Sequence, residues 1–89
     1  MRNEKLNIET RRAYAEAFGR CISFTNSLLY ENPPVDKMTM KMNIKEARSY
    51  YEKGRGSSFM SLCALRDLNS LEKRFGMNLT RDSDEGGNL

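Results

Sequence analysis

Apolar and small residues recur three and four positions apart between residues 7 and 30, which is the spacing of one face of an α-helix. They are Tyr14, Ala17, Phe18, Cys21, Ile22, Thr25, Leu28 and Leu29. The pattern predicts one long helix. Asn7 or Thr10 would cap this helix, and Pro33 and Pro34 would end it, because the residue before a proline avoids the helical conformation. Gly19 lies inside the helix, and we interpret it as a point where a neighbouring backbone comes close.

Three methionines follow the prolines at every second position. Met38, Met40 and Met42 alternate with Thr39 and Lys41. Alternation of this kind is typical of an extended chain, so residues 33–42 are predicted to be extended or irregular. The methionines are either a soft contact surface for another protein or another copy of the chain, or filling for a small core. Both roles stay open at this point.

Two further helices are predicted after the methionines. Asn43 with Glu46 forms a capping-box pattern that would begin a short second helix, continuing to residue 53. A third helix would begin at Ser57 or Ser58 and end at Gly76, with an apolar residue just beyond the glycine. The apolar face of this third helix consists of Phe59, Leu62, Cys63, Leu65, Leu68, Leu71 and Phe75.

These elements predict an all-α fold, in which a long helix lies antiparallel to a second, interrupted helical segment, as a helical hairpin or a three-helix domain. The 89 residues leave room for a single domain, which we place at residues 1–79, and exclude a Rossmann or TIM-barrel enzyme. Hydrophobic residues make up 38% of the chain and Trp is absent, so the core is small and we expect a homo-oligomer. Residues 80–89 are predicted to be a flexible acidic tail.

The charge of the chain is unevenly distributed. Residues 1–79 contain 14 basic and 9 acidic residues, a balance of +5, whereas the whole chain carries +3. A basic body favours an anionic partner, such as a nucleotide, a nucleic acid or an acidic protein surface. Because the basic residues are spread through all the predicted helices, a dedicated nucleic-acid binder is disfavoured.

The side chain most often used as a general base is missing. The chain has no His, the usual general base and neutral metal ligand near pH 7. Cys21 and Cys63 form no C-x-x-C pair, and we interpret both as buried thiols. No apolar stretch approaches the roughly 20 residues that cross a bilayer, and no signal peptide is recognised. We therefore expect a cytoplasmic protein that is not an enzyme, with no metal, no cofactor and no membrane contact.

Residues 53–58 have the sequence Lys-Gly-Arg-Gly-Ser-Ser, which suits a phosphate. Two glycines free the backbone to turn its N–H groups outward beside a predicted helix start, where unpaired donors and a partial positive charge gather. Lys53 and Arg55 would add full charges, and Ser57 and Ser58 would add hydroxyl donors. The alternative is an ordinary glycine-rich turn with a serine cap.

A basic and aromatic cluster accompanies this loop. Guanidinium groups bind phosphate and tyrosine rings stack on bases, so Arg48 is predicted to hold a phosphate and Tyr14 to stack on a base. The same residues would equally serve as helix packing and solvated surface. The cluster consists of Arg11, Arg12, Tyr14, Tyr30, Arg48, Tyr50 and Tyr51.

Parts of this region resemble a known family. Residues 47–49 (A-R-S), residues 56–62 (G-S-S-F-M-S-L) and the later Arg66 are similar to the second-helix signature of the small phage anti-CBASS proteins, which sequester cyclic oligonucleotide signals. The resemblance implies a compact helical homo-oligomer, hexameric in that family. Such an oligomer would hold cyclic di- or trinucleotides in pockets between subunits and release them unchanged.

The sequence therefore predicts a non-enzymatic, phage-type anti-defence protein that sequesters cyclic oligonucleotides in the host cytoplasm. The predicted ligand-binding residues are Tyr14, Arg48, Lys53, Arg55, Ser57 and Ser58. The alternative is a small helical interaction protein that inhibits a host or partner protein by covering its surface, using the methionine stripe and the basic helix face.

Overall fold

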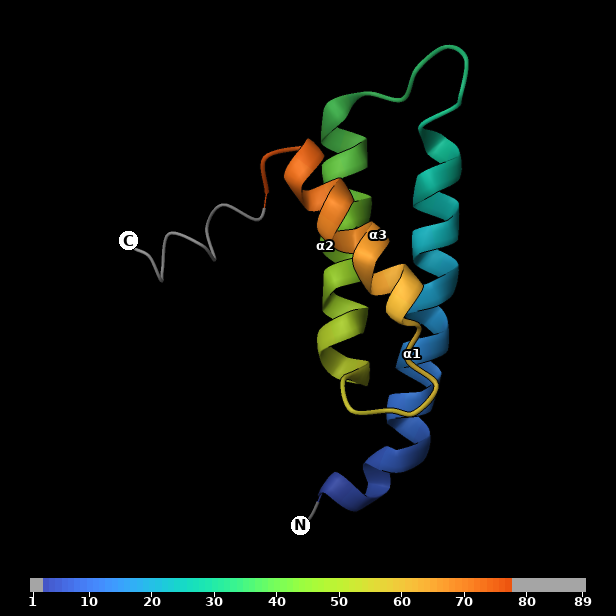
Figure 1. The fold of residues 1–89 in the computed structure, drawn as a ribbon, viewed down its shortest axis with the longest axis vertical. Coiled ribbons are helices and arrows are strands. Elements are labelled where there is room, and N and C mark those ends of the chain that lie inside the picture. The colour runs from blue at the N-terminus through green and yellow to red at the C-terminus, as the bar shows by residue number, and fades with distance from the viewer. Residues whose placement is uncertain (1–2, 78–89) are drawn as a thin grey trace, which may run out of the picture.

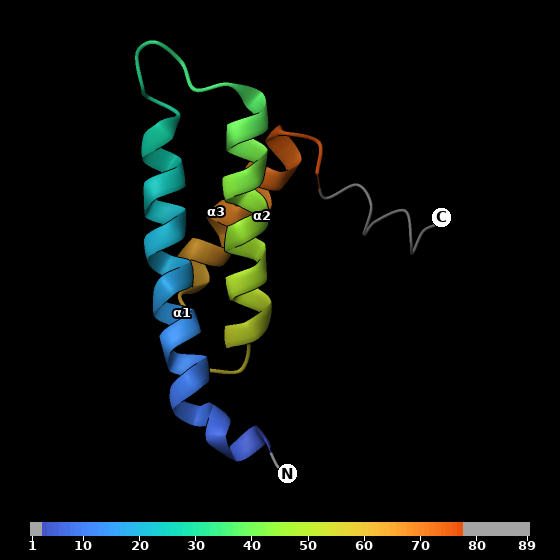
Figure 2. The ribbon, with the colours of Figure 1, turned by 180° about the vertical axis from the view of Figure 1, so that it is seen from behind.

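The computed structural model describes the backbone of residues 3–77 and the side chains of residues 8–77. This part of the chain forms three helices: α1 (Asn3–Leu28), α2 (Lys37–Gly54) and α3 (Leu62–Arg74). α1 and α2 are antiparallel, and α3 crosses one face of this hairpin obliquely, as the front and rear views show (Figures 1 and 2). The predicted all-α fold is confirmed. The predicted acidic tail, residues 80–89, lies outside the described residues.

α1 confirms the long first helix but begins earlier than predicted, at Asn3. Residues 4–9 contain neither Gly nor Pro and include several good helix formers, so the helix continues N-terminally past Asn7 and Thr10. The prediction that one of these residues caps it is therefore wrong. The interpretation of Gly19 is also wrong, because a Cβ atom there would have nothing within 4 Å among the described neighbours.

α2 begins at Lys37, inside the segment that was predicted to be extended, with Asp36 as its N-cap. The helix divides the methionine stripe between two sides. Residues two apart on a helix point in nearly opposite directions, whereas residues four apart share a side. Accordingly, Met40 is 2% exposed, whereas Met38 and Met42 are 65% and 62% exposed. One methionine therefore fills the core and two lie on the surface.

The capping-box prediction for the second helix is wrong, because Asn43 lies within α2 and donates from Nδ2 to the Thr39 carbonyl oxygen at 2.9 Å. The true start is supported by Asp36, whose carboxylate accepts the Thr39 hydroxyl at 2.6 Å. This hydrogen bond lowers the pKa of Asp36 below its ordinary value.

α3 begins at Leu62, later than Ser57 or Ser58, because Ser61 is its N-cap and accepts the Ala64 N–H at 3.1 Å. The predicted start is therefore wrong, and Phe59 lies outside the helix. The predicted end is confirmed. Gly76 has a φ of +69°, and the N–H groups of residues 76 and 77 donate to carbonyls of the last turn, as in a Schellman motif.

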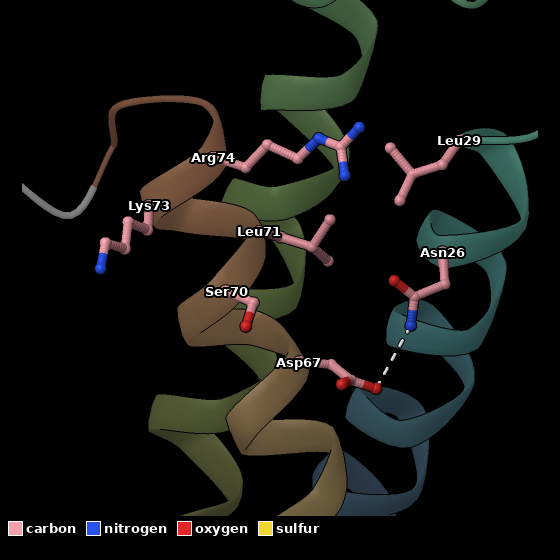
Figure 3. A pocket seen from close by; sticks show the side chains of 7 residues that line it. All are labelled: Asn26, Leu29, Asp67, Ser70, Leu71, Lys73 and Arg74. Carbon is pink, nitrogen blue, oxygen red and sulfur yellow. Dashed lines mark hydrogen bonds between the residues drawn. The ribbon is translucent and has the colours of Figure 1, made fainter.

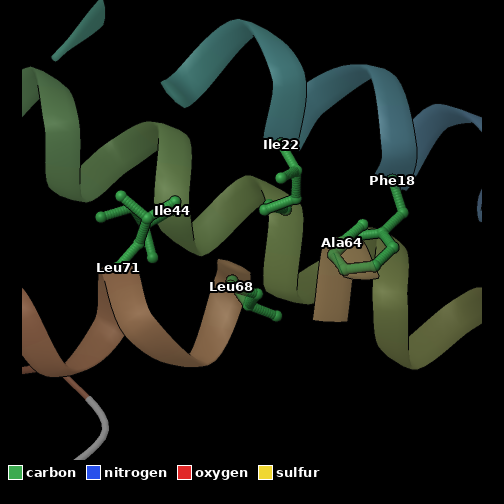
Figure 4. Close-up of a cluster of buried hydrophobic side chains, with 7 residues drawn as sticks. Phe18, Ile22, Ile44, Ala64, Leu68 and Leu71 are labelled. Atoms are coloured by element: carbon green, nitrogen blue, oxygen red, sulfur yellow. The ribbon is translucent and has the colours of Figure 1, made fainter. Parts of the chain in front are cut away.

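The core lies where the three helices meet. Phe18 and Ile22 of α1, Ile44 of α2 and Leu68 of α3 are each no more than 2% exposed, and Figure 4 shows them converging with Ala64 and Leu71. Over residues 3–77 no helix combines the length and apolar character that a bilayer crossing requires.

The two cysteines differ, contrary to the prediction that both are buried. Cys63 is exposed. Cys21 is partly buried and donates from Sγ to the Asn43 carbonyl oxygen at 3.7 Å, and burial raises the pKa of its thiol above the ordinary value. Near neutral pH, Cys63 is therefore the accessible thiol of the pair.

Candidate anion-binding groove

A very close approach of α1 and α2 determines where the α2–α3 loop lies. A Cβ atom at Gly54 would stand 2.7 Å from the Ala15 backbone nitrogen and 3.1 Å from the Arg11 carbonyl oxygen, so only glycine fits. From this point the chain leaves α2 and passes across the N-terminal half of α1 (Figure 1). The loop, residues 55–61, is therefore held against α1.

A groove of about 390 Å³ lies between this loop and α1. Two arginines from α1 face two serines and a glycine from the loop, and an aliphatic and an aromatic side chain complete the walls. The lining residues are Ile8, Glu9, Arg11, Arg12, Gly56, Ser57, Ser58 and Phe59. The groove combines charge, hydroxyls and apolar surface in a volume typical of small-molecule sites.

Arg11 is the cation of this groove that has no acidic partner among residues 8–77. Its Nη1 atom lies 3.2 Å from the position that a Cβ atom would take on Gly56. Gly56 has a φ of +93°, a conformation that favours glycine, so a larger residue there would be both strained and in the way of the guanidinium. In the described part of the chain, Arg11 has no carboxylate within 4 Å.

Arg12 is held by two neighbours. Its Nε atom lies 3.2 Å from Glu16 Oε2, and its guanidinium carbon lies 4.2 Å from the centroid of the Phe59 ring. The cation–π contact ties the loop to α1. Glu9 adds a carboxylate to the lining of the groove, where it can accept hydrogen bonds from amino groups of a ligand.

Three amides of the loop are used internally, whereas the expectation was a cradle of outward-facing N–H groups. The Ser57 N–H donates to the Gly54 carbonyl, the Phe59 N–H to Ser57 Oγ, and the Met60 N–H to the Ser57 carbonyl. The N-terminus of α3 begins only at Leu62. These three amides are therefore not free to bind a ligand, and the groove offers the side chains of its lining, including the predicted Ser57 and Ser58.

Arg48 is committed to an internal ion pair. Its Nε and Nη2 atoms donate to both oxygens of Glu72 at 2.8 and 2.7 Å, and Nη2 also contacts the Asn69 side chain at 3.3 Å. The Glu72 side chain is 6% exposed, and this hydrogen-bonded pair raises the pKa of Arg48. Arg48 therefore joins α2 to α3, and its role in ligand binding stays a prediction.

The other predicted residues lie outside the groove. Arg55 pairs with Glu52 at 2.8 Å, next to Arg48. The Lys53 ammonium stands 5.4 Å from the centroid of the Tyr14 ring. The six predicted residues are thus divided among the groove, an ion-pair network and a lysine–tyrosine contact, and binding at each of them stays a prediction.

A larger cavity of about 420 Å³ lies between α1 and α3, away from all six predicted residues (Figure 3). Asp67 and Asn26 face each other across it, and the Asn26 amide donates to the Asp67 carboxylate at 3.3 Å. Lys73 and Arg74 also line it, so the polar groups have mixed charge. We interpret this cavity as part of the packing between α1 and α3, because the carboxylate of Asp67 is already hydrogen-bonded to Asn26 on the opposite wall.

Comparison with known proteins adds no family to this description. No family model matches the chain, and neither a curated protein nor a solved structure matches it. Among the residues that the structure describes, no three metal-ligating side chains come together. The assignment of a candidate site therefore depends on the geometry of the groove alone.

Proposed function

We propose that this protein binds and sequesters a cyclic oligonucleotide, without chemical change, in the groove between α1 and the α2–α3 loop. The observation that carries the proposal is the position of Arg11, whose guanidinium has no carboxylate partner among the described side chains and lies beside Gly56, Ser57 and Ser58. Guanidinium and hydroxyl donors are the groups that bind phosphate oxygens. A phosphodiester fits this part of the groove.

The remaining walls suit a base. Phe59 is 53% exposed and Ile8 is 73% exposed, so an aromatic and an aliphatic surface stand beside the cationic part of the groove. Bases stack on aromatic rings, and the Glu9 carboxylate can accept from an exocyclic amino group. These groups match a ligand that carries both phosphates and bases.

The exposed apolar residues around the groove also support assembly of several copies. Ile8 and Phe59 both line the groove, and each is more than half exposed. Large apolar side chains that gather on a surface commonly mark a protein contact. A second copy would cover them and close the groove, which agrees with the oligomer implied by the resemblance to the phage anti-CBASS proteins.

Calorimetry with a panel of cyclic di- and trinucleotides tests this function. We expect one of them to bind with a submicromolar Kd and to be recovered intact after heating of the complex. Arg11→Gln should weaken binding about 10- to 100-fold, since a charge-assisted hydrogen bond contributes about 1.5–3 kcal/mol. Arg20→Gln is the matched control, because Arg20 is exposed on α1 and lies outside the groove. Absence of heat with every nucleotide would contradict the proposal.

A second candidate function is binding of a protein partner through α2. Met38 and Met42 are one turn apart on the same side of α2 and largely exposed, as an adaptable contact surface requires. Under this alternative the nucleotide panel gives no heat. A single partner then co-purifies with the chain, and Met38→Glu with Met42→Glu abolishes that contact.

A further inference from the structure

A second cationic cavity lies at the opposite end of the hairpin from the groove. Lys37 and Lys41 of α2, with Arg74 and Phe75 at the end of α3, line a cavity of about 350 Å³. Figure 1 shows the start of α2 and the end of α3 at the same end of the molecule, far from the α2–α3 loop. We propose that this cavity binds a small multivalent phosphate of the pyrophosphate class.

The charges around the cavity are uncompensated among the side chains of residues 8–77. Three of its four lining residues are cationic, and none is acidic. Within the part of the chain that the structure describes, none of the three cations has a carboxylate within 4 Å. The neighbouring Asp36 carboxylate is engaged by the Thr39 hydroxyl. Three like charges around one cavity repel each other, and a bound anion relieves this repulsion.

The geometry favours a ligand with more than one phosphoryl group. Lys37 and Lys41 are one turn apart on α2, whereas Arg74 reaches the cavity from α3, so a ligand must contact two separate walls. The Arg74 guanidinium can bind phosphate oxygens in pairs, and the lysines act as point charges. Phe75 packs against the core and provides a fixed wall without donors.

Titration of the full-length chain with sodium pyrophosphate, followed by amide NMR, tests this site. We expect shifts at residues 37–41 and 74–76, and about tenfold weaker binding in Arg74→Gln and in Lys41→Gln. Arg66→Gln removes the same charge from an exposed position on α3 that does not line the cavity, and it should bind normally. The proposal would be overturned if the Arg66 and Arg74 variants bound pyrophosphate equally weakly, or if the amide shifts were confined to residues 56–59.

The carboxylates near the C-terminus could compete with pyrophosphate for the three cations. The titration is therefore repeated with a variant that carries Asp82→Asn, Asp84→Asn and Glu85→Gln. If the parent protein or the triple variant binds pyrophosphate, and the binding depends on Arg74, the proposal is supported. If neither protein binds pyrophosphate, the proposal is overturned. Arg11→Gln should leave the pyrophosphate-induced shifts at residues 37–41 and 74–76 unchanged. The result is therefore independent of the proposed function, which depends on the groove.

Discussion

Gly54 offers a test of the packing that positions the groove. In Gly54→Ala the new methyl group would stand 2.7 Å from the Ala15 nitrogen and 3.1 Å from Ala15 Cα, both of them backbone atoms of α1. A backbone cannot rotate away as a side chain can, so the two helices must move apart. Forced overpacking of this kind costs about 1–3 kcal/mol. Alanine gains little helix propensity at this position, because Gly54 is the last residue of α2.

We expect Gly54→Ala to lower the free energy of unfolding by about 1–2 kcal/mol, which corresponds to a Tm decrease of about 4–16 °C for a domain of this size. Urea unfolding followed by circular dichroism measures the change. Gly19→Ala is the matched control, because its methyl group would meet nothing within 4 Å and should stabilise α1 by up to about 1 kcal/mol. Equal stability of the Gly54 variant and the parent chain, or equal losses in both variants, would refute the close approach.

Three further predictions concern α3 and the thiols. Arg48→Met should lower the free energy of unfolding in urea by about 3 kcal/mol, because it removes the arginine from the ion pair with the buried Glu72 carboxylate. Arg48→Met with Glu72→Met should recover most of the loss. Ser61→Ala should lower the free energy of unfolding by about 1 kcal/mol, because α3 loses its N-cap. An unchanged midpoint of the urea unfolding transition would contradict the role of Ser61 as the cap. Ellman's reagent should modify Cys63 in a fast phase and Cys21 in a slow phase. The slow phase should accelerate only at higher pH, because burial raises the pKa of Cys21. The Cys63→Ser variant should lose the fast phase.

The elements that local patterns determine were predictable from the sequence. The apolar spacing of α1 and the glycine that ends α3 are local signals, and the structure confirms both. The start of α2 was not predicted, because Met38, Met40 and Met42 alternate as in a strand. Their alternation reflects opposite sides of a helix, one buried and two exposed.

The groove could not be predicted, because its two walls are more than forty residues apart in the sequence. Arg11 and Arg12 were visible only as members of a basic cluster, and Phe59 was assigned to the face of a helix. What unites them is the contact of Gly54 with α1, which is a tertiary feature without a local signal. Arg48 was chosen for its charge, and nothing in its sequence neighbourhood pointed to Glu72 on α3.

A crystal structure of the chain with a cyclic dinucleotide or trinucleotide from the calorimetric panel tests the binding site most directly. We predict a phosphate within hydrogen-bond distance of the Arg11 guanidinium and of the Ser57 or Ser58 hydroxyl, with a base against Phe59. A nucleotide bound elsewhere, with no contact to Arg11, Ser57 or Ser58, would contradict the account.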